Sequence, residues 1–251
     1  MKILGLETSG LVASVAVVED DTLLAEYTIN YKKTHSQTLL PMLDEVAKMT
    51  ELDLKSVDYI AVSAGPGSFT GLRIGSATAK GLGLALQKEL IHVPTVDGLA
   101  YNLVGARELV CPLMDARRNQ VYTGLYAFEQ DRMTILVEQC AVDIQDIIGK
   151  INEQGKAVVF LGDGVPVYRP AIEESCRVPF YFAPAHMNRQ RGASVAALGL
   201  QYALEGKTES AAAHRPDYLR LTQAERERNE RAAMNSVSGE NDPTQEKQKS
   251  L

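Results

Sequence analysis

Short apolar runs, separated by turns of polar residues and glycine, predict a chain of strands and helices. Three strands are expected in succession, at residues 2–7, 13–18 and 23–29. From Ser36 to Met49 the apolar residues recur every three or four positions, which predicts a helix. The apolar stripe of this helix consists of Leu39, Leu40, Leu43, Val46 and Ala47.

A fourth strand is predicted at residues 59–64, and a glycine-rich loop leads from it into a helix that ends near Leu86. The short strand LIHVP and a helix from about Asp97 to Ala106 follow. The first part of the chain is therefore expected to have the order β-β-β-α-β-α.

The same order repeats after Glu108. Three strands are predicted in LVCPLMDA, VYTGLYAFE and TILVEQCAV, followed by a helix, the strand AVVFLG and two further helices. The three helices are expected near residues 143–153, 167–176 and 193–204. The chain is thus predicted to contain one supersecondary unit twice.

Acidic residues and glycines stand at equivalent places in the two units. Glu7 and Asp115 each end a first strand, and the glycine turns at 65–67 and 162–164 close equivalent later strands. A duplicated β-β-β-α-β-α unit with acidic residues at two facing hairpins is the plan of the actin, hexokinase and Hsp70 ATPase superfamily. The predicted fold class is therefore α/β with two such units, and this likeness of architecture assigns no reaction.

The repeat divides the chain into three segments. Residues 1–107 are expected to form an N-terminal half that binds a partner, and residues 108–221 a second half of the same type. Residues 222–251 carry many charges and too little apolar surface to offset their ordering entropy, so a disordered tail is predicted there.

Composition narrows the function classes. Of the 251 residues, 45% are hydrophobic and 23% are charged, which is typical of a soluble globular protein. The sequence has neither the pattern of an export signal nor a window of 18 apolar residues, so a cytoplasmic location without a membrane is expected. The net charge of −6 argues against independent RNA binding, because contacts of Lys and Arg to phosphate dominate that affinity.

The stretch SAGPGSFTGLRIG, which begins at Ser63, has features of a phosphate-binding loop. Its glycines allow the backbone to approach an anion, and the following helix offers unpaired N–H groups. It lacks the lysine of a Walker loop and the GxGxxG spacing. A tight strand-to-helix turn is therefore favoured over a phosphate site.

Small residues recur every fourth position in the helix that follows. Gly71, Gly75, Ala79 and Gly83 share one face, which makes a smooth ridge that another backbone can approach closely. From the residues alone, the chain's own sheet and a helix of another subunit are equally good partners for this ridge.

Other side chains give weaker signals. His35 is expected to be a polar residue near a helix start, and His92, His186 and His214 form no HxxxH or HExxH pair, so no metal site is predicted.

Two pairs of charged residues leave a choice open. Glu7 and Asp115 would suit either a magnesium-bound nucleotide or a turn whose N–H groups they satisfy. Arg117 and Arg118 are expected to be a solvated pair rather than an anion site.

Five segments together resemble a known family. ILGLETS, HSQTLLPMLDEV, VSAGPGSFTGLRIGSATAKGLG, MDARRNQVYTGLY and PDYLR occur in the order and approximate spacing of the bacterial TsaB (YeaZ) proteins, over residues 2 to about 220. The resemblance implies a cytoplasmic subunit of the complex that installs threonylcarbamoyl on the adenosine beside the anticodon of tRNAs reading codons that begin with A. In that family TsaD carries the catalysis, TsaE supplies an ATPase, and TsaB is a scaffold that TsaD requires.

The resemblance also implies which residues are absent and which bind the partner. TsaD has a His-x-x-x-His metal pair where Thr95 and Leu99 stand in this sequence, so the chain is expected to be no enzyme on its own. The chain is expected to bind no cofactor on its own, although ATP or ADP can bind within the complex. It is expected to contact tRNA only as part of the complex. The alternative is a free-standing ATPase or phosphotransferase of the same superfamily.

The two N-terminal helices are implied to pair with the matching helices of TsaD in a four-helix arrangement, and a homodimer is expected to use the same face without TsaD. The predicted interface residues are Leu39, Leu40, Leu43, Gly71, Gly75, Ala79 and Gly83.

Overall fold

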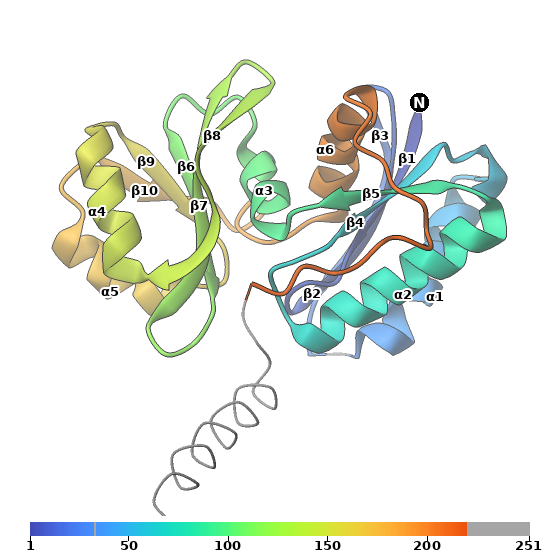
Figure 1. Ribbon diagram of the computed structural model, residues 1–251, viewed down its shortest axis with the longest axis horizontal. Coiled ribbons are helices and arrows are strands. Elements are labelled where there is room, and N and C mark those ends of the chain that lie inside the picture. The colour runs from blue at the N-terminus through green and yellow to red at the C-terminus, as the bar shows by residue number, and fades with distance from the viewer. Residues whose placement is uncertain (33, 220–251) are drawn as a thin grey trace, which may run out of the picture. The chain divides into compact units, whose positions relative to one another are not determined.

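Two mixed five-stranded sheets with the same strand order form the framework of the computed structural model (Figure 1). The structure describes residues 1–32 and 34–219, and residues 1–219 cluster into one compact unit. The tail predicted at residues 222–251 lies outside the described residues.

The first sheet has the order β3-β2-β1-β4-β5. Its first three strands pair antiparallel in sequence, while β4 runs parallel to β1 and β5 runs parallel to β4. The strands are β1 (Lys2–Glu7), β2 (Val12–Glu19), β3 (Thr22–Asn30), β4 (Tyr59–Ser63) and β5 (Glu89–Val93).

The second sheet repeats this plan in the order β8-β7-β6-β9-β10. Again three antiparallel strands come first, and the two later strands join parallel beside the first of them. The strands are β6 (Leu109–Asp115), β7 (Gln120–Glu129), β8 (Arg132–Asp143), β9 (Val158–Leu161) and β10 (Phe180–Phe182). The predicted duplication is confirmed.

Helices cover the sheets in equivalent ways. The pair α1 and α2 packs on one face of the first sheet and α6 on the other, while α4 contacts β7 and β8 and α5 contacts β6 of the second sheet. The short α3 contacts β6, β7 and α6. The helices are α1 (His35–Met49), α2 (Phe69–Leu86), α3 (Thr95–Ala100), α4 (Ile144–Gln154), α5 (Val165–Ser175) and α6 (Gly192–Leu204), with 3-10 turns at Leu54–Ser56 and Tyr101–Leu103. Among the described residues, no helix is both long enough and apolar enough to cross a membrane.

Two elements differ from the prediction. The helix expected to run to Ala106 ends at Ala100, and Gly105 takes a φ of +81°, a left-handed conformation that does not continue a helix. Strand β10 was not predicted, because three residues between Pro179 and Ala183 are too few to display a period.

The last helix belongs to the first sheet although it lies in the second sequence segment. Small residues allow the close approach: a Cβ on Gly5 would meet the carbonyl oxygen of Gly192 at 2.4 Å, and one on Gly199 would meet Cβ of Ala61 at 2.6 Å. Residues 108–221 therefore do not fold on the second sheet alone.

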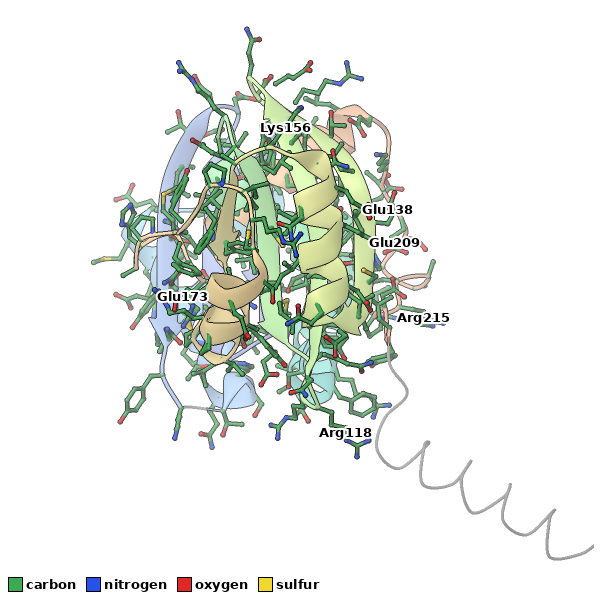
Figure 2. The ribbon with its side chains drawn as sticks, turned by 90° about the vertical axis from the view of Figure 1, so that its left-hand side faces the viewer. Arg118, Glu138, Lys156, Glu173, Glu209 and Arg215 are labelled. Carbon is green, nitrogen blue, oxygen red and sulfur yellow. The ribbon has the colours of Figure 1, made fainter. Side chains whose placement is uncertain are left out.

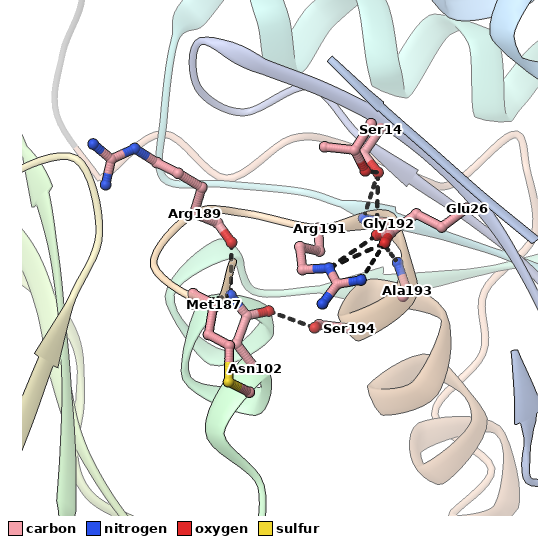
Figure 3. A network of polar contacts seen from close by, with 10 residues as sticks. Ser14, Glu26, Asn102, Met187, Arg189, Arg191, Gly192, Ala193 and Ser194 are labelled. Atoms are coloured by element: carbon pink, nitrogen blue, oxygen red, sulfur yellow. Dashed lines mark hydrogen bonds and ion pairs between the residues drawn. The ribbon is translucent and has the colours of Figure 1, made fainter. Parts of the chain in front are cut away.

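Side chains from β2 and β3 hold the N-terminus of α6 (Figure 3). The Gly192 N–H donates to Oγ of Ser14 at 2.8 Å, and the Ala193 N–H donates to Glu26 at 3.1 Å. Glu26 also forms an ion pair with Arg191. Because helix N-termini have unpaired N–H groups and favour negative charge, this network fixes where α6 begins.

Candidate functional site

The chain itself closes the glycine-rich loop between β4 and α2. Gly65 has a φ of +120°, and a Cβ there would meet the carbonyl oxygen of Asp217 at 2.1 Å. The Gly65 N–H donates to Oγ1 of Thr95 at 3.1 Å, and the Ser68 N–H donates to the carbonyl of Ser9 at 2.6 Å. These N–H groups are therefore not directed at an external anion.

The start of α2 is capped in the same internal way. Ser68 is the N-cap residue, and its Oγ accepts from the Gly71 N–H at 3.3 Å. A Cβ on Gly67 would meet the carbonyl oxygen of Ser9 at 2.3 Å, so glycine is required where the hairpin after β1 touches the loop. The structure thus favours the tight turn over the phosphate site.

The ridge of small residues on α2 packs against this chain's own first sheet. A Cβ at Gly71 would meet the carbonyl oxygen of Thr8 at 2.1 Å, and one at Gly75 would meet Oγ1 of Thr8 at 2.3 Å. A Cβ at Gly83 would meet Cβ of Ala211 at 2.9 Å and Cδ2 of Leu90 at 3.0 Å. Thr8 in turn donates from Oγ1 to the carbonyl of Gly71 at 2.8 Å.

The predicted partner face therefore needs correction. Ala79 is completely buried. It belongs to one apolar cluster with Leu39 and Leu43 of α1, which are 1% and 4% exposed. These side chains form the core between the two helices and the sheet, so they are not accessible to a partner. Of the seven predicted interface residues, only Leu40 is exposed, at 54%.

A different set of residues lies on the solvent side of the helix pair. On α2, positions 70, 77, 81 and 84 share one face by helical spacing, and a Cβ on Gly81 would meet nothing within 4 Å. Leu84 is 63% exposed. We call Leu40, Thr70, Ala77, Gly81 and Leu84 the outer helix surface.

The two hairpin acids have different environments. Glu7 is 1% exposed, and its Oε1 accepts from the N–H and the hydroxyl of Ser9 at 2.5 and 2.6 Å. Burial raises the pKa of Glu7 to about 7, although the Ser9 hydrogen bonds act in the opposite direction. A carboxyl so deeply buried is not exposed to a hydrated magnesium ion.

Asp115 is exposed at the turn that follows β6. Its Oδ1 accepts from the Arg117 N–H at 2.8 Å and from the Tyr168 hydroxyl at 3.2 Å. Asp115 thus satisfies donors of its own turn and of α5, which is the simpler of the two predicted roles. Arg117 and Arg118 are exposed at the same turn, and Figure 2 shows the Arg118 side chain extending away from the protein.

The two units also share their turn geometry. Gly162, which follows β9, has a φ of +111°, close to the value of Gly65, which follows β4. The Gly164 N–H donates to the carbonyl of Leu113 at 2.9 Å, as the Ser68 N–H donates to Ser9. The two glycine turns therefore share a left-handed backbone after a parallel strand, although Gly65 lies against Asp217 and Gly162 against Leu113 of β6.

Two residues stand where the resemblance to TsaD expects metal ligands. Thr95 and Leu99 lie on α3 and are each 1% exposed. The Thr95 hydroxyl accepts from the Gly65 N–H, and Leu99 belongs to an apolar cluster. Both side chains are thus engaged in packing and turn closure.

The histidines are distributed differently from the sequence prediction. A ring nitrogen of His35 lies 2.9 Å from the carbonyl oxygen of Gly10, which fits a polar residue at a helix start. His92 and His214, far apart in sequence, have ring centroids 5.8 Å apart. This pair cannot be recognised from the spacing of histidines along the sequence, because an isolated β-bridge between Leu90 and Glu209 brings the two histidines together.

Comparisons with known proteins identify the family. Residues 22–228 match the family model described as TsaD: tRNA N6-adenosine threonylcarbamoyltransferase. The chain is 33% identical over 227 residues to the tRNA threonylcarbamoyladenosine biosynthesis protein TsaB of Bacillus subtilis, a match that covers 90% of this chain and 96% of the relative. The chain belongs to the TsaB (YeaZ) family.

Further relatives agree with this assignment. A TsaB protein of the same description from Escherichia coli is 32% identical over 134 residues, which cover 52% of this chain and 57% of that relative. The solved structure of YeaZ from Pseudomonas aeruginosa has a TM-score of 0.73 at 25% identity, covering 87% of this chain and 99% of that one. A ROK hexokinase from Thermus thermophilus, at a TM-score of 0.50 and 12% identity over 82% of this chain and all of that one, shares the fold alone. The predicted actin- and hexokinase-like fold of this TsaB-family chain is confirmed.

Proposed function

We propose that this chain is a noncatalytic scaffold subunit of a complex that forms threonylcarbamoyladenosine in tRNA. The modified base is the adenosine beside the anticodon of tRNAs that read codons beginning with A. Its relatives named for threonylcarbamoyladenosine biosynthesis support the pathway. The scaffold role rests on α3, where Thr95 and Leu99 are buried in packing at the positions where TsaD is expected to hold its metal.

The catalytic partner in this proposal is a TsaD protein. TsaD binds the outer helix surface, where Ala77 and Gly81 leave room for a partner helix and Leu40 and Leu84 provide exposed apolar area. In the absence of TsaD, two copies of this chain use the same surface, because a surface that binds a relative of the same fold suits symmetric self-association. TsaE joins the complex as its ATPase.

Substrate and nucleotide are assigned to the rest of the complex, which acts in the cytoplasm. The net charge of −6 gives this chain little attraction for tRNA phosphates, so tRNA is held through the complex. ATP or ADP enters the assembled complex rather than this chain alone, because Glu7 is buried and the turn N–H groups of Gly65 and Ser68 are already bonded. The same two observations disfavour a free-standing ATPase or phosphotransferase.

Reconstitution tests this proposal. Purified TsaD and TsaE are incubated with a threonylcarbamoyl donor and unmodified tRNA, with and without this chain, and modified adenosine is quantified by mass spectrometry of digested tRNA. Modification is expected only when this chain is present. This chain and the donor without TsaD are expected to yield none. Modification without TsaD, or equal modification without this chain, contradicts the scaffold role.

A further inference from the structure

Two histidines and a glutamate meet at the free edge of the first sheet. His92 lies on β5, whose Leu90 exchanges two backbone hydrogen bonds of 2.8 and 2.9 Å with Glu209. This bridge brings the segment that carries Glu209 and His214 alongside the edge strand. Lys80 of α2 donates to the carbonyl of His214 at 3.1 Å and fixes the other side of the segment.

Each of the three side chains offers one ligand atom, and the three atoms lie within 4.8 Å of one another. Oε1 of Glu209 is 2.7 Å from Nδ1 of His214 and 3.9 Å from Nδ1 of His92. In a tetrahedral zinc site, bonds of about 2.0–2.2 Å place ligand atoms roughly 3.3 Å apart. The 2.7 Å contact is a hydrogen bond between the two side chains, and the three ligand atoms together fall within 4.8 Å of one another, so the side chains have to rotate to reach the spacing of a zinc site.

The environment suits a ligand better than a purely structural histidine. His214 is completely buried, and because its Nδ1 is hydrogen-bonded to Glu209, its Nε2, which has no hydrogen-bond partner among the described residues, is the nitrogen left for a ligand. The carboxylate supplies one negative charge.

The cluster is also open to solvent on one side. The side chains of His92 and Glu209 are 33% and 28% exposed, and both border a concavity of about 340 Å³. Its lining residues are His92, Pro94, Tyr202, Lys207, Thr208 and Glu209. The ammonium of Lys207 is paired with Glu205 at 2.6 Å, which reduces its repulsion of a cation. Water therefore has access to a fourth coordination position.

We propose that His92, Glu209 and His214 form a binding site for a divalent transition-metal ion of the zinc type. Two imidazole nitrogens select such ions over Mg²⁺ and Ca²⁺, which prefer oxygen ligands. Three protein ligands with an open fourth position are typical of sites that keep a water or exchange a ligand. The ion would also fasten residues 209–214 to β5. This site is separate from the outer helix surface, so the metal site and the scaffold role can be tested independently of each other.

Calorimetry on the full chain tests the site. The protein is stripped with a chelator, dialysed and titrated with Zn²⁺ and, separately, with Mg²⁺. One Zn²⁺ per chain is expected, with a Kd of roughly 1 μM or tighter and no comparable Mg²⁺ binding. Replacing Zn²⁺ with Co²⁺ is expected to give the visible absorption bands of a four-coordinate nitrogen- and oxygen-ligated ion. Absence of Zn²⁺ binding by the wild-type chain, or equally tight Mg²⁺ binding, overturns the proposal.

Matched variants locate the bound ion. Glu209→Gln keeps the size of the side chain and an oxygen that accepts from His214, and His92→Asn changes a half-buried edge position. Each is expected to weaken Zn²⁺ binding at least about tenfold and to abolish the rise in melting temperature that Zn²⁺ gives the wild-type chain. His186→Asn, at an exposed histidine outside the cluster, is expected to bind as the wild type does. Zn²⁺ affinity unchanged in both site variants overturns the proposal.

Discussion

The hydroxyl of Tyr126 donates a 2.6 Å hydrogen bond to Oδ1 of Asp97 in a completely buried position. Tyr202 donates to the other carboxylate oxygen at 3.1 Å. The three residues lie on α3, β7 and α6, so one carboxyl joins elements that pack on both sheets. Burial raises the pKa of Asp97, while the two tyrosine hydrogen bonds lower it.

Tyr126→Phe is therefore expected to destabilise the fold. The ring is retained, but the buried carboxyl of Asp97 loses its shorter hydrogen bond, which costs about 1–3 kcal/mol of the free energy of unfolding. Urea denaturation followed by circular dichroism measures this loss. Tyr181→Phe is the control, because Tyr181 is 46% exposed and its bond to Glu108 is on the surface, so a change below about 0.5 kcal/mol is expected. Equal effects of the two variants would show that Asp97 is not a structural junction.

Glu7→Gln is expected to change how stability depends on pH. Since the pKa of Glu7 is about 7 in the folded chain and 4.5 as its ordinary value, the folded state binds more protons between these values. The wild-type free energy of unfolding therefore falls as pH rises through this window, by about 3 kcal/mol from this residue. The Gln variant lacks this titrating group. Its free energy of unfolding minus that of the wild type should therefore increase from pH 5 to pH 8.

The measurement is a series of urea titrations at half-unit pH intervals. Glu19→Gln serves as the control, since Glu19 is only partly buried at the end of β2. A stability difference between Glu7→Gln and wild type that is constant from pH 5 to 8 would mean that Glu7 does not titrate in this range.

Two alanines on α2 separate its buried face from its outer face. Ala79 is completely buried and Ala77 is exposed. Ala79→Leu overpacks the core beneath the helix and should lower the free energy of unfolding by about 1–3 kcal/mol. Ala77→Leu makes the same chemical change on the solvent side and should alter it by less than about 0.5 kcal/mol. Thermal and urea unfolding compare the two, and similar losses would contradict the assigned orientation of α2.

The order of the strands and helices was predictable because each unit has clear period-2 and helical patterns and glycine turns at matching places. The orientation of α2 was not, because small residues recur every fourth position on both of its faces: Ala77 and Gly81 parallel Gly75 and Ala79. The contact of Thr8 with Gly71 and Gly75 decides which face is buried. That contact depends on tertiary structure and cannot be predicted from the spacing of residues along the helix.

The histidine cluster escaped prediction for a related reason. His92 and His214 are separated by most of the second unit, and only the bridge between Leu90 and Glu209 brings them together. In the same way, the repeat suggested a simple division at residue 107, whereas α6 returns to the first sheet because Gly192 and Gly199 fit closely against it.

The central claim is that this chain is a scaffold which binds TsaD through the outer helix surface. The most direct test measures the affinity of TsaD for three variants of this chain, Ala77→Leu, Leu84→Asp and Ala79→Leu. Isothermal titration calorimetry gives each Kd, and melting temperatures confirm that the variants tested are folded. The two outer-surface variants should bind at least about tenfold more weakly with near-normal stability, a loss of about 1.4 kcal/mol or more. Folded Ala79→Leu should bind as the wild type does. Wild-type affinity in both outer-surface variants would contradict the claim.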